Sequence, residues 1–326
     1  MKITKIEVIP ANIPWRGVYV LSYGVANPSS VIVKMHTDSG IEGAGEVAAM
    51  PGYSGADQQA LVSTIRNVLA PPLIGADPLN IRRLHEIMDT SVFVRSAARS
   101  AKAALDMAAY DIAGKALGVP VSTLLGGAYR DRIPVYASSG GVGTPEEAAE
   151  QAQEVVDKGF THLKMKGSKD PWLDFQRVAA IRKAVGDEID LRVDPNLGYI
   201  SAKQAIPALK AMEAYNITMI EDPLPSHDYY GMLQVSQAID TPLTIHQGLV
   251  SPEEAANLIH YGVGDIFNIC VPVVGGLYEA LKILAIADSF NIPVLVGSNR
   301  DTSIGDAASA HFASVIRDLP YACDCR

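Results

Sequence analysis

Cysteine is scarce in this chain: it occurs three times, at Cys270, Cys323 and Cys325. So few thiols cannot form the disulfide framework that stabilises small secreted proteins. The opening residues, MKITKIEVIP, also lack the long apolar stretch and the small-residue cleavage site of a signal peptide. Both absences lead us to expect a protein of the reducing cytoplasm.

Long apolar runs and an excess of positive charge are missing as well. No apolar run reaches the roughly 18 residues that a membrane-spanning helix needs. Lys and Arg number 27 against 36 Asp and Glu, which gives a net charge of −9. An acidic chain repels phosphate backbones, so we expect neither a nucleic acid nor a membrane as a partner. The hydrophobic fraction, 48% of 326 residues, is instead enough for a large buried core.

The first 130 residues have the pattern of a separate α+β unit. Three segments within residues 1–50 alternate like strands, and Asp38-Ser39-Gly40 fits a hairpin turn between two of them. Residues 57–117 change to helical spacing, and Gly118 and Pro120 end that helical pattern. The sequence therefore predicts an N-terminal α+β domain over residues 1–130.

A different rhythm begins at residue 133. Short apolar runs end near residues 140, 166, 194, 221, 247, 270 and 298, at intervals of 23 to 28 residues, and helix-like segments separate them. Such a spacing suits strand–helix units, and YACD near the end supplies an eighth strand. The pattern predicts the α/β class, with a parallel (β/α)8-type barrel over residues 131–326. An open doubly wound sheet is the alternative, although no Gly-rich phosphate loop follows the first strand.

Barrel enzymes carry their chemistry at the C-terminal strand ends, so polar residues there predict a site. Asp194 and Glu221 end consecutive strands, and hard carboxylate oxygens suit Mg²⁺. Helix caps or loop salt bridges are the other interpretation. Lys164 and Lys166, one strand earlier, project to the same face. Two neighbouring ammonium groups lower each other's pKa, and a lysine near neutrality can act as a base. The alternative here is a solvated strand end.

A set of motifs across the whole chain carries a family resemblance. They are EGAGE (42–46), AKAALDMAAYDIAGKALGVP, LLGG (124–127), LKMKG (163–167), RVDPN (192–196), IEDP (220–223), VGG (274–276) and ALKILAIADSFNIPVLVGS. With them the chain resembles the enolase superfamily, in the mandelate racemase/muconate lactonizing enzyme group, and most of all its muconate lactonizing branch with a Lys-x-Lys motif. The resemblance implies a (β/α)7β barrel with an N-terminal capping domain. It also implies a divalent ion that stabilises the enediolate formed by removing the proton α to a carboxylate.

The resemblance also implies roles for individual residues. Lys166 matches the base, Lys164 its partner, and Asp194 and Glu221 the first two metal ligands. Two capping loops, at about residues 14–30 and 48–57, are expected to set specificity. The residues expected to contact substrate are Asn196, His246, Tyr19, Tyr53 and Ser298, and Asp301 is expected to orient a catalytic group or to contact substrate.

Three departures from the family pattern affect the predicted chemistry. The position of the third metal ligand aligns with Gln247, a neutral residue, so we expect weak Mg²⁺ binding. His246 beside it suits Mn²⁺ or another softer divalent ion better. Cys270 stands where a second lysine is expected, either as a thiolate base or as a buried core residue. The chain ends at Arg326, apparently without the family's C-terminal return segment.

These observations predict a metal-dependent enzyme acting on a small carboxylic acid or amino-acid derivative. The expected reaction is cycloisomerisation, dehydration as a lyase, or racemisation or epimerisation; the missing second lysine favours the first two. The alternative is a catalytically impaired relative that binds a small carboxylate without turnover. Mg²⁺ is the expected cofactor, with Mn²⁺ or another divalent ion as the alternative. We also expect a homo-oligomer.

Overall fold

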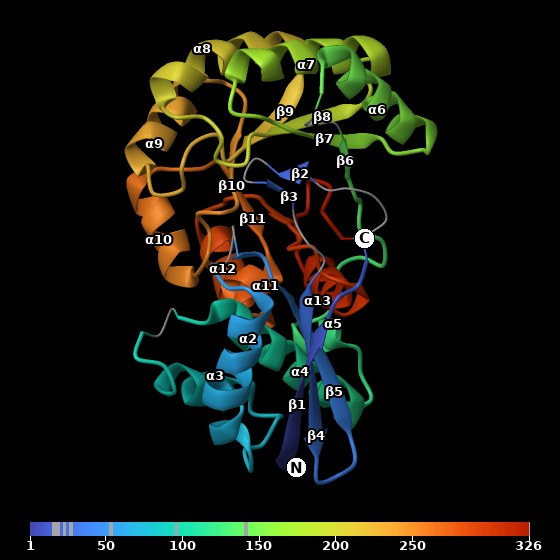
Figure 1. The fold of residues 1–326 in the computed structure, drawn as a ribbon, viewed down its shortest axis with the longest axis vertical. Coiled ribbons are helices and arrows are strands. Elements are labelled where there is room, and N and C mark those ends of the chain that lie inside the picture. The colour runs from blue at the N-terminus through green and yellow to red at the C-terminus, as the bar shows by residue number, and fades with distance from the viewer. Residues whose placement is uncertain are drawn as a thin grey trace.

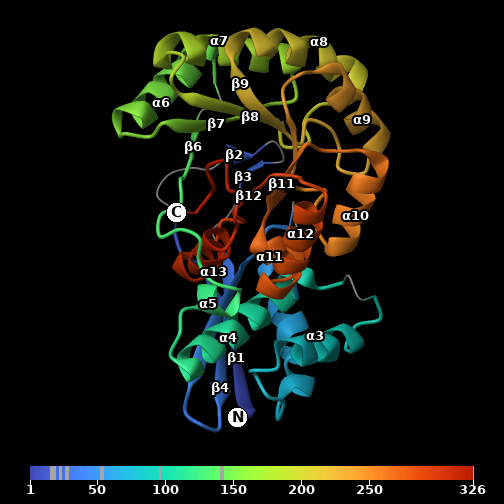
Figure 2. The same cartoon turned by 180° about the vertical axis from the view of Figure 1, so that it is seen from behind.

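The computed structural model describes residues 1–14, 20–21, 24–25, 29–51, 55–94, 97–139 and 143–325. It contains an antiparallel sheet in the order β1-β4-β5 and a seven-stranded sheet in the order β12-β11-β10-β9-β8-β7-β6. The two sheets lie at opposite ends of the long axis of the molecule, each with its own helices (Figures 1 and 2). No helix within the described ranges is both long enough and apolar enough to cross a bilayer.

The N-terminal unit is the sheet-then-helix arrangement that the sequence predicts. Its strands are β1 (Ile3–Ala11), β4 (Ser30–Thr37) and β5 (Glu42–Ala48), with the short pair β2 (Val20–Leu21) and β3 (Gly24–Val25). Its helices are α2 (Gln58–Thr64), η1 (Ile65–Leu69), η2 (Pro71–Leu73), α3 (Ile81–Thr90), α4 (Arg99–Leu117) and α5 (Val121–Leu124). The tight turn after Thr37 joins β4 to β5, and Gly118 ends α4 in the left-handed conformation, as expected.

Close contact between β5 and α4 explains the glycines of the EGAGE segment. A Cβ atom at Gly43 or Gly45 would collide with the carbonyl oxygens of Ala108 and Ala104 in α4. Only glycine lets the strand lie this close to the helix backbone. The glycines thus fix where β5 runs, and Glu46, the last residue of the segment, is held completely buried.

The C-terminal unit alternates strands and helices along the chain. The strands are β6 (Ala137–Ser139), β7 (His162–Lys166), β8 (Asp190–Asp194), β9 (Ile217–Glu221), β10 (Leu243–Ile245), β11 (Ile266–Ile269) and β12 (Val294–Val296). The helices are α6 (Pro145–Asp157), α7 (Pro171–Val185), α8 (Ala202–Met212), η3 (Glu213–Tyr215), α9 (Tyr229–Ala238), α10 (Pro252–Tyr261), α11 (Val271–Val274), α12 (Leu277–Ser289) and α13 (Ser303–Ser314). Neighbouring strands pair in parallel, which confirms the predicted strand positions. The strands also follow one another in chain order across the sheet, whereas an open doubly wound sheet reverses its order at a switch point.

The predicted eighth strand is a short closing segment. Val135, just before β6, forms a parallel bridge with Cys323. The backbone N–H of Cys323 donates to the carbonyl oxygen of Pro134 at 2.8 Å, and that of Asp324 donates to Val296 in β12, also at 2.8 Å. One side of this segment therefore bonds the last strand and the other side bonds the chain entering the first, which closes the ring.

Two buried clusters follow the two units. One contains side chains of the barrel strands and their surrounding helices, and the other lies between the antiparallel sheet and α2, α3 and α4. The helices of the C-terminal unit cover the outside of the curled sheet (Figure 1). The division of the chain at residue 130 stays a prediction.

Candidate active site

The strand register brings four of the predicted residues to one interior face. Lys166 in β7 is the direct partner of Asp194 in β8. Val193 in β8 pairs with Ile220 in β9, so the next residues, Asp194 and Glu221, end two neighbouring strands. Because side chains alternate along a strand, Lys164, two residues before Lys166, lies on the same face. Lys164 is 3% exposed, Asp194 0% and Glu221 1%, so these charged groups are inside the barrel and not at a solvated strand end.

Ion pairs join these four side chains. The ammonium of Lys164 lies 3.3 Å from a carboxylate oxygen of Asp194 and 3.3 Å from both oxygens of Glu221. Lys166 pairs with the same oxygen of Asp194. The aromatic ring of Tyr136 lies next to Lys164, with its centroid 4.7 Å from the Lys164 ammonium. The buried charges are therefore balanced by one another, as burial of charge requires.

The electrostatics of this cluster correct one sequence-based expectation. Burial alone would lower the pKa of Lys164, but the negative charges of Glu221 and Asp194 outweigh it, so this pKa lies well above its ordinary value. Burial would likewise raise the pKa of Glu221, yet Lys164 and His246 hold it well below its usual range. We expected the two lysines to lower each other's pKa. That expectation is wrong for Lys164, because two carboxylates are its nearest charged neighbours.

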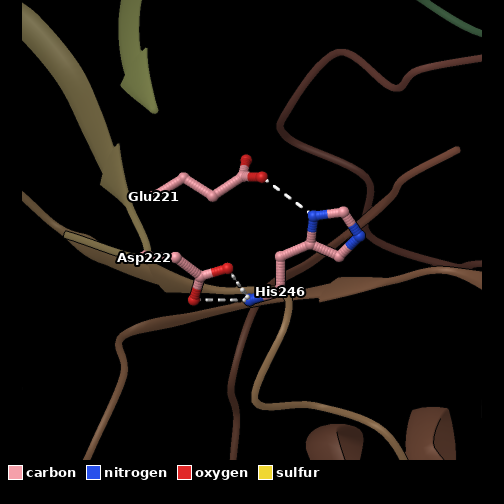
Figure 3. Close-up of side chains that lie close together, drawn as sticks. All are labelled: Glu221, Asp222 and His246. Carbon is pink, nitrogen blue, oxygen red and sulfur yellow. Dashed lines mark hydrogen bonds and ion pairs between the residues drawn. The ribbon is translucent and has the colours of Figure 1, made fainter. Parts of the chain in front are cut away.

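A second cluster of possible metal ligands continues from Glu221. Glu221, Asp222 and His246 each place a ligand atom within 4.8 Å of the other two. Nδ1 of His246 lies 3.0 Å from Oε1 of Glu221, and Figure 3 shows the ring turned toward that carboxylate. Asp222 instead accepts the backbone N–H groups of His246, at 3.1 and 3.2 Å, and of Gln247, at 2.7 Å. Burial raises the pKa of Asp222 to about 7.

The residues present fit a divalent cation. Asp194 and Glu221 converge on one cationic group, the Lys164 ammonium, so the space between them already attracts positive charge. The side-chain oxygen of Gln247 is buried and has no hydrogen-bond partner among the described residues, which is the state of an acceptor that awaits a ligand. A role for Gln247 as a metal ligand stays a prediction.

Cys270 and Asp301 lie on the opposite side of the barrel. Cys270, which follows β11, is 1% exposed. Burial and the nearby Asp301 raise its pKa well above the ordinary value. Asp301 follows β12, and burial together with Glu46 raises its pKa to about 8. Both shifts favour the protonated form, so neither group is a ready base.

Glu46 links the N-terminal unit to this side. Its carboxylate accepts the backbone N–H groups of Thr302, at 2.8 Å, and of Gly305, at 3.1 Å. One oxygen of Asp301 accepts the N–H of Asn299 at 3.1 Å, and the other is buried without a partner in the described part of the chain. The capping sheet thus positions the loop after β12.

The remaining predicted residues are placed as follows. Asn196 is in the left-handed conformation and donates its backbone N–H to Asp194 at 2.9 Å. The hydroxyl of Ser298 accepts the N–H of Arg300 at 3.1 Å within its own turn. Tyr19 and Tyr53 lie outside the described residues. Contact of any of these residues with substrate stays a prediction.

Sequence reasoning missed several residues of the site. Asn268 in β11 donates to Glu221 at 3.3 Å, and the negative charge of Asp324 acts on Lys164 and Tyr136. Alternation along DIFNIC would have placed Asn268 on the face of Cys270, because the two are two residues apart. No local pattern indicates the contact between Glu46 and the loop after β12, because Thr302 and Gly305 are 256 and 259 residues away in sequence.

Comparison with known proteins decides the family. Residues 4–126 match the mandelate racemase/muconate lactonizing enzyme N-terminal domain, and residues 147–326 match the enolase C-terminal domain-like family. The chain belongs to the mandelate racemase/muconate lactonizing enzyme family. This confirms the resemblance, and with it the barrel and its N-terminal cap.

Three relatives show the range of this family around the chain. N-succinyl-L-Arg/Lys racemase of Bacillus cereus is 36% identical over 96% of this chain and 84% of its own length. A dipeptide epimerase of Enterococcus faecalis, in a crystal structure with Mg and the dipeptide L-Leu-L-Tyr, has a TM-score of 0.94 at 31% identity, covering 100% of this chain and 90% of that one. Chloromuconate cycloisomerase CbnB of Cupriavidus necator is 27% identical over 99% of this chain and 87% of its length.

Family membership makes the chain an enzyme of the mandelate racemase/muconate lactonizing type. It abstracts the proton α to a carboxylate to form an enediolate, in agreement with relatives that are named as a racemase, an epimerase and a cycloisomerase. The alternative of a catalytically impaired binding protein is not favoured.

Proposed function

We propose that this enzyme removes the α-proton of a small carboxylic acid or amino-acid derivative from one face only, with Lys166 as the base. The observation that carries the proposal is the asymmetry of the barrel. Two lysines paired with carboxylates lie on one side, and a buried thiol whose pKa is raised lies on the other. Cycloisomerisation or elimination needs a base on one face only, whereas two-base racemisation needs one on each.

Each residue has a distinct task in this scheme. Asp194 and Glu221, with a third ligand at position 246 or 247, would hold a weakly bound divalent ion, Mg²⁺ or Mn²⁺, which supplies positive charge to the substrate carboxylate. Lys166, which pairs with Asp194 as an ammonium, would first have to lose a proton and would then take the α-proton onto Nζ. The Lys164 ammonium offers its charge to the developing enediolate. Asn196 follows β8 and Ser298 follows β12, four strands apart in the sheet, and from these two places both would contact the substrate.

Racemisation or epimerisation is the second candidate. It is favoured by the 36% identity to the Bacillus cereus racemase over nearly the whole chain. In that reaction Cys270 exchanges the proton on the second face, with Asp301 orienting it. The thiol would have to ionise inside a buried site that raises its pKa, so the structure favours the one-sided reaction.

Deuterium exchange at the α-carbon separates the two candidates. Both enantiomers of N-acylated amino acids, dipeptides and small hydroxy acids are incubated with the enzyme and a divalent ion in D₂O, and loss of the α-proton is followed by NMR. One-sided chemistry predicts that Lys166→Ala abolishes all exchange and that Cys270→Ser retains most of it. Exchange of both enantiomers, with Cys270→Ser silencing one of them, would establish the second candidate. A cytoplasmic location and a homo-oligomeric state remain predictions.

A further inference from the structure

The strand register makes His246 the neighbour of Glu221 inside the barrel. Thr244 in β10 is the direct partner of Glu221 in β9. His246 follows Thr244 by two residues and lies just past the end of β10, in the bend that leads to the turn containing Gln247. The distance of 3.0 Å between His246 Nδ1 and Glu221 Oε1 agrees with this placement.

The backbone at His246 is held in place by a dedicated acceptor. Both oxygens of Asp222 accept the N–H of His246, and one of them also accepts the N–H of Gln247. Figure 3 shows Asp222 directed at this backbone and Glu221 directed at the ring. The carboxylate of Asp222 is thus occupied by the chain itself, and it fixes the turn that presents the imidazole. His246 is itself 9% exposed, so its ring is largely desolvated.

An imidazole among the ligands would change which divalent ion this site prefers. A set made of Asp194, Glu221 and an imidazole has two negative charges and one nitrogen. Mg²⁺ prefers hard oxygen ligands, whereas imidazole suits later divalent ions, whose affinity rises from Mn²⁺ to Co²⁺ and Ni²⁺. We propose, building on the proposed function, that His246 is a nitrogen ligand of the divalent ion and that the site therefore prefers Mn²⁺ or Co²⁺ to Mg²⁺.

The test measures the metal itself and not activity. Calorimetric titration of the full chain, freed of metal by a chelator, compares Mg²⁺, Mn²⁺ and Co²⁺. We expect Mn²⁺ and Co²⁺ to bind at least about tenfold more tightly than Mg²⁺. Pulsed EPR of the Mn²⁺-loaded protein should show nitrogen hyperfine modulation from a directly bound imidazole.

Matched variants assign that nitrogen. His246→Asn should remove the nitrogen modulation, whereas His260→Gln, which changes an exposed histidine in α10, should retain it. His246→Asp restores a third carboxylate and should tighten Mg²⁺ by about tenfold. It also serves as the folded replacement if His246→Asn does not fold.

The outcomes separate this inference from the proposed function. Absence of nitrogen modulation in the native protein, its persistence in His246→Asn, or equal affinity for Mg²⁺ and Mn²⁺ would overturn the inference. In that case His246 is only a hydrogen-bond donor to Glu221. Deuterium exchange measured on the same preparation with Mg²⁺ would still test the proposed function, because exchange needs Lys166 whatever the third ligand is.

Discussion

Glu221 and Asp301, two buried carboxyl groups on opposite sides of the barrel, have pKa values shifted in opposite directions by their neighbours. Glu221 faces Lys164 and His246, which hold its pKa well below the usual range. Asp301 faces Glu46, and burial with this like charge raises its pKa to about 8. Burial acts in the same direction on both, so the difference comes from the sign of the nearest charge. One side of the barrel therefore contains paired ions, and the other contains Cys270 and Asp301, whose pKa values are raised.

Removing the base on the charged side should have the largest effect. Lys166→Ala should reduce α-proton exchange by about 10²–10⁴-fold or more, because a positioned general base contributes that much to a proton transfer. Lys169→Ala, which changes an exposed lysine three residues away, should exchange at the native rate. Near-native exchange in Lys166→Ala would mean that another group removes the proton.

Removing the counter-ion on the same side should destabilise the fold. Lys164→Met leaves Asp194 and Glu221 buried together without their shared cation, and breaking a buried pair in this way costs about 3 kcal/mol of unfolding free energy. Urea denaturation of the metal-free protein measures the loss. A divalent ion should recover part of it by replacing the lost positive charge. Unchanged stability would show that the buried pair contributes no net stabilisation.

The contribution of Asp301 to the stability of the fold should depend on pH. The pKa of Asp301 is raised in the folded protein, so the native state holds its proton more tightly than the unfolded chain. Its contribution to stability is complete below about pH 4, the unfolded pKa, and is lost as the pH rises to about 8. Asp301→Asn should therefore gain stability over the native protein from pH 5 to pH 8, by up to about 1.4 kcal/mol per pH unit.

Denaturation curves at several pH values follow this difference. Asp187→Asn, which replaces a carboxylate that is 86% exposed, is the matched control. Its unfolding free energy should change with pH in the same way as that of the native protein. A pH-independent difference for Asp301→Asn would show that Asp301 is already ionised in the folded state.

Adding a carboxylate at position 246 or 247 tests which of the two residues is the third metal ligand. If Gln247 is a ligand, Gln247→Glu should tighten Mg²⁺ by roughly tenfold, because a carboxylate replaces a neutral oxygen. Calorimetry on this variant and on His246→Asp compares the two positions directly. Tightening by His246→Asp alone would assign the position to the imidazole, and tightening by Gln247→Glu alone would assign it to the amide.

The positions of the strands could be predicted because each one ends at a regular interval in polar residues. Lys164, Lys166, Asp194 and Glu221 were grouped correctly for that reason. Which of His246 and Gln247 lies beside Glu221 could not be predicted, because it depends on where β10 ends and on its register with β9. The direction of the Lys164 pKa and the contact of Glu46 with Thr302 both arise from long-range neighbours, which local patterns do not encode.

The smallest effect should come from the thiol. Cys270→Ser conserves shape, and Cys270 has little part in one-sided chemistry, so exchange should fall by less than about threefold. Any loss of stability should be within about 1–2 kcal/mol, the range for placing a hydroxyl in a buried apolar position. Exchange rates and denaturation curves of this variant measure both.

The stereochemistry of α-proton exchange tests the central claim most directly. Separate enantiomers of an exchanging substrate are incubated in D₂O with the native enzyme, with Lys166→Ala and with Cys270→Ser. The one-sided account predicts that a single enantiomer exchanges, that Lys166→Ala abolishes the exchange, and that Cys270→Ser retains it. Exchange of both enantiomers, one lost in Lys166→Ala and the other in Cys270→Ser, would contradict the account and establish a two-base enzyme.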